Sequence, residues 1–209
     1  MRLDLEGSAG RIEALHEEPP SPRFAALVLH PHPLYGGTMH NHATYQIAKA
    51  ARSEGGATLR MNFRGVGLSR GAHAGGAGEA DDARAALSWL GRRHPGLPLF
   101  TAGMSFGAAV ALRVGCAAPG AAGVLAAGVA LRSFRLEFVA GCGKRIAGVQ
   151  AEQDEFGSPA EVATLLSGPP ERRRLFVVPG TTHLFLEDLP ALGAAATAAW
   201  AWLAPSREA

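Results

Sequence analysis

Cysteine is scarce in this 209-residue sequence, which holds only Cys116 and Cys142. Two cysteines without a C-x-x-C spacing are too few for a disulfide framework, so we expect both thiols to be reduced and the protein to be cytoplasmic. An excess of charge is missing too, because 20 basic and 18 acidic residues leave a net charge of +2. So small a charge gives no electrostatic footprint for nucleic acid, which we do not expect as a partner.

Long hydrophobic runs are also lacking. The apolar stretch over residues 117–131 is interrupted by one proline and three glycines, which suits a buried strand with its turns better than a membrane span. Residues 1–7 are charged and have no apolar core like that of a signal peptide. These absences predict a protein without a membrane partner.

What the sequence does have is an alternation of short apolar runs with helix-like segments. After a hairpin over residues 3–16, strands are expected at 25–29, 57–63, 97–102, 123–127, 145–150 and 175–178. Helices are expected at 42–53, 79–90, 108–112, 159–166 and 190–203. This alternation predicts an α/β fold, in which a parallel sheet is covered on both faces. The length fits one domain over residues 1–209, with no segment long enough for a cap domain.

The pentapeptide Gly103-Met-Ser-Phe-Gly107 lies between a predicted strand and a predicted helix. A serine in so tight a turn adopts a rare backbone conformation and needs neighbours without side chains two residues away on each side. The turn lifts the Ser105 hydroxyl to a helix N-terminus, where free N–H groups favour negative charge. Ser105 is therefore the candidate nucleophile, and the plainer alternative is a helix N-cap between flexible glycines.

A serine hydroxyl needs a base and an acid that orients the base. Asp154 follows the strand expected at 145–150, and His183 follows the strand expected at 175–178. The order serine, acid, histidine is the one found in enzymes with this type of turn. We predict that His183 is the base and Asp154 the acid. Glu152 and Glu155 stay open as alternative acids, and a surface-loop histidine is the alternative interpretation of His183.

An oxyanion formed at Ser105 would need two N–H donors. The residue after the nucleophile, Phe106, supplies the first, and the loop over residues 30–37 is expected to supply the second. Prolines have no N–H, so Leu34 or Tyr35 is the candidate, with Leu34 preferred. Tyr35 and Met104 are the candidates for the lining of the substrate pocket.

Two other motifs compete with this interpretation. Four histidines cluster between residues 30 and 42, but they lack the ligand spacings typical of zinc sites, so we expect no metal. The glycines over residues 65–71 miss the dinucleotide-binding spacing by one residue, and Gly75-Gly76 interrupts the helix that should follow. We expect no cofactor.

Three motifs give the chain a familiar pattern: His30-Pro-His-Pro-Leu-Tyr-Gly-Gly-Thr-Met-His-Asn41, Met61-Asn-Phe-Arg-Gly-Val-Gly-Leu-Ser69 and the pentapeptide around Ser105. With them, nearly the whole chain resembles the α/β-hydrolase superfamily. Within it the chain looks like the small, capless bacterial serine hydrolases related to dienelactone hydrolase. Dienelactone hydrolases themselves use a cysteine nucleophile, so their lactone chemistry is not implied.

The resemblance implies a mostly parallel sheet of six to eight strands with helices on both faces. It implies Ser105, Asp154 and His183 as a catalytic triad, and the N–H groups of Leu34 and Phe106 as an oxyanion hole. It also implies small carboxylic-ester substrates, no cofactor and a cytoplasmic location. The sequence does not predict an oligomeric state.

We therefore expect a carboxylesterase that forms an acyl-enzyme on its serine and prefers short acyl chains, because an uncapped site is open and shallow. A thioesterase or peptidase would use the same residues. A non-catalytic binding or scaffold protein on a hydrolase fold is the alternative of another class, since fold does not determine function.

Overall fold

The computed structural model describes residues 1–204, within which eight strands form one sheet. The strands are β1 (Arg2–Gly7), β2 (Gly10–Glu17), β3 (Phe24–Leu29), β4 (Gly56–Met61), β5 (Leu99–Met104), β6 (Ala121–Ala127), β7 (Arg145–Ala151) and β8 (Arg173–Val178). Their order across the sheet is β1-β2-β4-β3-β5-β6-β7-β8. Strands β3 to β8 are parallel, whereas β2 pairs antiparallel with β1 and β4. The predicted fold class is confirmed.

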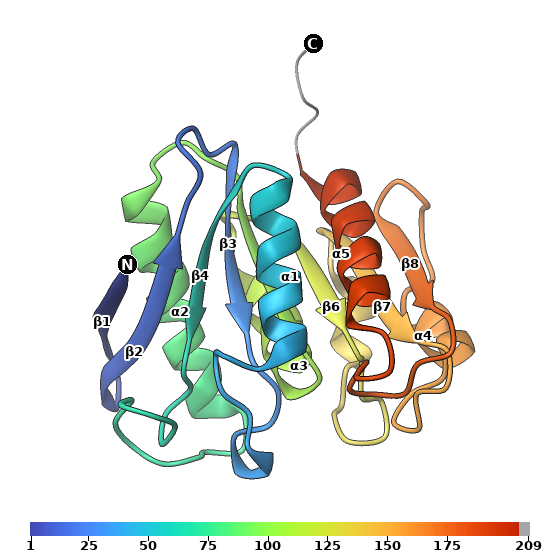
Figure 1. Ribbon diagram of the computed structural model, residues 1–209, viewed down its shortest axis with the longest axis horizontal. Coiled ribbons are helices and arrows are strands. Elements are labelled where there is room, and N and C mark those ends of the chain that lie inside the picture. Colours follow the sequence, from blue (N-terminus) through green and yellow to red (C-terminus); the bar gives the residue numbers. More distant parts are fainter. Residues whose placement is uncertain (205–209) are drawn as a thin grey trace.

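Helices cover both faces of this sheet. They are α1 (His42–Ser53), α2 (Ala77–Arg93), α3 (Phe106–Ala117), α4 (Pro159–Leu165) and α5 (Leu189–Leu203), with short 3₁₀ helices η1 (Pro33–Tyr35) and η2 (Glu137–Gly141). Helices α1 and α5 lie in front of the sheet in Figure 1, and α2 and α3 lie behind it. No helix within residues 1–204 combines the length and the apolar character needed to cross a membrane.

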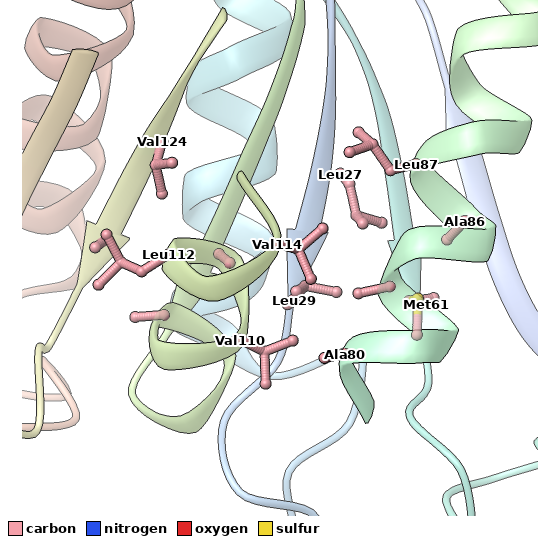
Figure 2. Packing of buried hydrophobic residues seen from close by; sticks show 14 of the residues in the cluster. Leu27, Leu29, Met61, Ala80, Ala86, Leu87, Val110, Leu112, Val114 and Val124 are labelled. Atoms are coloured by element: carbon pink, nitrogen blue, oxygen red, sulfur yellow. The ribbon is translucent and has the colours of Figure 1, made fainter. Parts of the chain in front are cut away.

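The central strand β3 is fully buried because its side chains alternate between two hydrophobic clusters. Figure 2 shows Leu27 and Leu29 on the face covered by α2 and α3, near Leu87 and Val114 of those helices. The residue between them, Val28, belongs to the cluster under α1 and α5. A strand covered on both faces must be apolar at every position, which is why this segment has no polar alternation.

The carboxyl ends of the parallel strands meet at one edge of the sheet, the lower edge in Figure 1. Ser105 directly follows β5, Asp154 lies three residues after β7, and His183 lies in the loop after β8. Loops at this edge are where ligands bind in open α/β sheets. The fold thus brings the predicted site residues to one place.

The prediction of two reduced thiols is wrong. Cys116, at the end of α3, forms a disulfide with Cys142, which follows η2. The two Cα atoms are 5.3 Å apart, a usual separation for a disulfide. The pairing joins residues separated by 26 positions, so no local spacing in the sequence indicated it.

Candidate active site

The turn around Ser105 has the backbone strain that its sequence predicts. Ser105 has φ 55° and ψ −116°, in a region that residues with a side chain rarely adopt. A Cβ at Gly103 would lie 2.3 Å from the carbonyl carbon of Gly107, and one at Gly107 would lie 2.5 Å from the carbonyl oxygen of His30. Both glycines are therefore required for the turn to pack under the first residues of α3.

A chain of hydrogen bonds runs from Ser105 through His183 to Asp154. The Ser105 Oγ lies 2.8 Å from His183 Nε2, and His183 Nδ1 lies 2.8 Å from Asp154 Oδ2 and 3.0 Å from its Oδ1. Because Nδ1 faces a carboxylate, it carries the proton, and Nε2 keeps a lone pair for the serine hydroxyl. This arrangement can take a proton from Ser105 and hold the resulting imidazolium beside a negative charge.

The three predicted acids make different contacts. Asp154 is the one whose carboxylate contacts His183, and it also accepts a hydrogen bond of 2.9 Å from the N–H of Phe156. The Glu152 carboxylate accepts a hydrogen bond from the N–H of Gly180, in the loop that carries the histidine. Glu155 is exposed at the pocket.

Gln150, which sequence reasoning missed, orients the Asp154 carboxylate. Its side chain is fully buried, and Nε2 donates to Asp154 Oδ2 at 2.8 Å and to the carbonyl of Gly157 at 2.7 Å. Its Oε1 accepts from the N–H of Val129 at 2.8 Å. An amide near the end of a strand that is apolar from Ile146 to Val149 was the available signal, because a buried amide requires partners.

Some backbone N–H groups near Ser105 already donate a hydrogen bond to another group of the protein, and others have no acceptor within the described residues. The N–H of Phe106, the first residue of α3, has no acceptor within residues 1–204, as is normal at a helix start. Leu34 does not match its prediction, because its N–H donates to His32 Nδ1 at 3.2 Å and so caps η1. The N–H of Tyr35 donates to the carbonyl of His32. The N–H of His32 itself has no acceptor in the described part of the chain.

A cavity of about 450 Å³ opens beside Ser105. It is lined by Pro31, His32, Tyr35, Gly36, Gly37, Asn41, Ser105, Ala130, Ser133, Phe134, Glu155, Phe156, His183 and Leu184. Tyr35 lies in this lining as predicted, and its side chain is exposed. The pocket prediction for Met104 is wrong, because its side chain points into the cluster under α1 and α5 and packs next to Gly128.

His30 anchors the loop that forms one wall of the cavity. Its Nε2 accepts from the N–H of Phe63 at 3.1 Å, and its Nδ1 lies 2.6 Å from the carbonyl of Pro31. Burial lowers the pKa of His30 to about 4, so the ring is neutral at neutral pH. Nε2 thus joins the loop after β3 to the loop after β4, and Nδ1 makes a contact within the loop after β3.

A family model described as serine aminopeptidase, S33, matches residues 22–153. The chain belongs to this family. The matched region runs from just before β3 to the residue before Asp154, so it includes Ser105. Membership places the chain in the α/β-hydrolase superfamily and supports hydrolytic activity.

Three proteins illustrate what this S33 family member is similar to. An uncharacterized protein of Rickettsia prowazekii is 44% identical over 115 residues, which are 54% of this chain and 48% of that protein, so the match spans about half of its length. A lidless α/β serine hydrolase of Xanthomonas campestris is 29% identical, with a TM-score of 0.89 over 100% of this chain and 96% of that chain. An α/β serine hydrolase homologue of Coxiella burnetii is also 29% identical, with a TM-score of 0.85 over 95% and 96%.

Proposed function

We propose that this protein is a serine hydrolase that cleaves small carboxylic esters through an acyl-enzyme on Ser105. The observation that carries the proposal is the unbroken chain of hydrogen bonds from Ser105 through His183 to Asp154, at the wall of an open cavity. The strained turn, the N–H of Phe106 and the family membership are consistent with it.

In the first half-reaction, Ser105 Oγ attacks the ester carbonyl carbon while His183 Nε2 takes the hydroxyl proton. The carbonyl oxygen becomes an oxyanion, which the N–H groups of Phe106 and His32 would stabilise. We assign the second donor to His32 instead of Leu34, because the Leu34 N–H is engaged in the cap of η1. The oxyanion then collapses, the bond to the alcohol oxygen breaks, and His183 returns the proton to that oxygen. In the second half-reaction, water attacks the acyl carbon while His183 Nε2 takes a proton from the water. The new oxyanion collapses, the bond between the acyl carbon and Ser105 Oγ breaks, and His183 returns the proton to Ser105 Oγ as the acid leaves.

The pocket favours small substrates. Its volume of about 450 Å³ is at the lower end of the range for ligand sites, and its lining includes the apolar side chains of Phe134, Phe156 and Leu184. These apolar groups suit a short acyl or alkyl group. We therefore propose a preference for short-chain esters.

Turnover of p-nitrophenyl acetate, butyrate and palmitate tests this function. We expect the two short esters to be hydrolysed faster than palmitate, and a fluorophosphonate probe to label Ser105. Ser105→Ala should lower kcat by about 10⁴-fold or more, because the nucleophile acts as a unit with its base. A preference for palmitate would overturn the short-chain proposal. Folded protein that neither reacts with the probe nor turns over any ester would favour the non-catalytic binding protein.

An aminopeptidase is the second candidate, since the family model carries that description and the Glu155 carboxylate lines the cavity. A carboxylate there could hold the ammonium group of a peptide N-terminus. Aminoacyl p-nitroanilides distinguish the two functions: an aminopeptidase would cleave them and would lose that activity, and not its ester hydrolysis, in Glu155→Gln.

A further inference from the structure

A second group of chemically capable side chains lies away from Ser105. It consists of His16 near the end of β2, Glu18 in the following loop, and His94, which caps the end of α2. Helix α2 begins beside Phe106, and its 17 residues carry the chain about 25 Å from that point. The group, here called the His16–Glu18–His94 cluster, is thus separate from the site proposed above.

Three potential ligand atoms converge in this cluster. His16 Nε2 lies 3.0 Å from His94 Nε2, and the Oε2 atom of Glu18 lies 3.8 Å from the first nitrogen and 3.4 Å from the second. The point equidistant from these three atoms lies about 2.0 Å from each of them, which is the length of a zinc bond to imidazole nitrogen or carboxylate oxygen.

Hydrogen bonds within the cluster do not account for the position of Glu18. Its distances to the two imidazoles exceed those of good hydrogen bonds, and no hydrogen bond reaches its Oε2 atom within residues 1–204. The other oxygen, Oε1, accepts a hydrogen bond of 2.7 Å from Arg93. The arginine therefore holds the carboxylate so that its unengaged oxygen faces the two histidines.

The cluster is also ordered and accessible. Both imidazoles are buried, and His16 packs edge-on against Trp89 at 5.4 Å between ring centroids, so little freedom would be lost on binding. Glu18 and His94 line a surface depression with Pro19, Pro20, Pro22 and Arg93, from which water could complete the coordination.

We propose that His16, Glu18 and His94 bind one divalent transition-metal ion, for which Zn²⁺ fits the donor set of two imidazoles and one carboxylate. The ion joins the end of β2, the loop after it and the end of α2, so its role is structural. It stabilises the folded chain because the three ligands converge only in the native state.

Zn²⁺ binding to the metal-stripped full chain tests the site. Isothermal titration should give one ion per chain at the cluster, and thermal unfolding should shift upward by several degrees in excess ZnCl₂. His94→Gln and Glu18→Gln should each weaken binding at least tenfold and remove most of the thermal shift. His42→Gln, which removes an exposed histidine at another place, should bind like the wild type.

Glu18→Gln is the decisive variant, because an exposed side chain can change without unfolding the protein. The alternative explanation, a metal-free hydrogen bond between two neutral imidazoles, predicts no stoichiometric binding. Absence of binding to the wild type, or equal affinity in wild type and Glu18→Gln, would overturn the proposal. Ester hydrolysis is measured in parallel, and we expect Glu18→Gln to leave its rate unchanged. An unchanged rate would distinguish a failure of the metal proposal from a failure of the proposed function at Ser105.

Discussion

The loop residue His32 shows how one residue can contribute through both its side chain and its backbone. Its Nδ1 accepts the N–H of Leu34 and so begins η1, while its own N–H has no acceptor within residues 1–204. It lines the same cavity as Ser105, and its ring lies 5.0 Å from that of Phe106. A free N–H at this place suits an oxyanion donor, whose value depends on being positioned before the reaction begins.

Substitution of His32 separates the two contributions. The φ angle of His32 is −55°, which proline adopts without strain, so His32→Pro removes the N–H at a φ angle that suits proline. His32→Ala keeps the N–H and removes only the side chain. We expect His32→Pro to lose about 10²–10³-fold in kcat on p-nitrophenyl acetate relative to His32→Ala, the usual cost of one oxyanion donor. Equal rates in the two variants would contradict the assignment.

Single residues were predictable where a motif restricts the backbone. Ser105, Asp154 and His183 could be named because each follows a strand and the turn chemistry is local. Met104 and Leu34 could not be placed correctly, for two physical reasons. The face to which a strand side chain points depends on the register of the whole strand, and a capping interaction such as that of His32 is known only once the loop has folded.

At the scale of elements, α3 connects the candidate nucleophile at its start to a disulfide at its end. Cys116 near the end of the helix is joined to Cys142 after η2. The segment before η2 contributes Ser133 and Phe134 to the cavity wall. The disulfide therefore closes a loop that contains part of this wall.

Removal of the disulfide should lower the free energy of unfolding by about 2–4 kcal/mol, because the bond restricts the unfolded chain over a separation of 26 residues. Urea unfolding of wild type and of the double variant Cys116→Ser, Cys142→Ser measures the difference. Dithiothreitol should destabilise the wild type alone. If both proteins unfold at the same urea concentration without reductant, the bond contributes nothing to stability.

Helices and strands were largely predictable, since α1 spans residues 42–53 as expected and the strands lie within a few residues of their predicted ranges. Apolar periodicity and helix-stop residues determine these elements locally. The 3₁₀ helices η1 and η2 and the disulfide were not predicted. The two 3₁₀ helices are too short to leave a periodic signal in the sequence, and the disulfide joins residues 26 positions apart.

For the whole molecule, buried histidines connect stability to pH. His30 has its pKa lowered to about 4 by burial, and burial also lowers the pKa values of His16, His32 and His94. Below pH 6.5 the unfolded chain takes up protons at these residues more readily than the folded chain does. The contribution of these histidines to the free energy of unfolding is therefore fully present above pH 6.5 and is lost as the pH falls toward 4.

The lowered pKa of His30 alone should reduce the free energy of unfolding by about 2–3 kcal/mol between pH 7 and pH 4.5. The linkage relation gives this loss for a pKa of 6.5 in the unfolded chain and about 4 in the folded chain. Urea unfolding at the two pH values measures this loss. His30→Asn should show a smaller difference between the two pH values, and the exposed control His42→Gln should keep that of the wild type. An unchanged pH dependence in His30→Asn would contradict the role of His30.

The lidless fold determines how closely a substrate can be enclosed. The cavity beside Ser105 is open to solvent, and the fold has no cap domain over it. Bulk water beside the reacting atoms raises the local dielectric constant and weakens each electrostatic contribution to the rate. If the protein acts on esters as proposed, we expect the same openness to leave the alcohol part largely outside the cavity. We therefore expect modest turnover over a broad range of alcohols, a generalist profile that a panel of acetate esters with different leaving groups would measure.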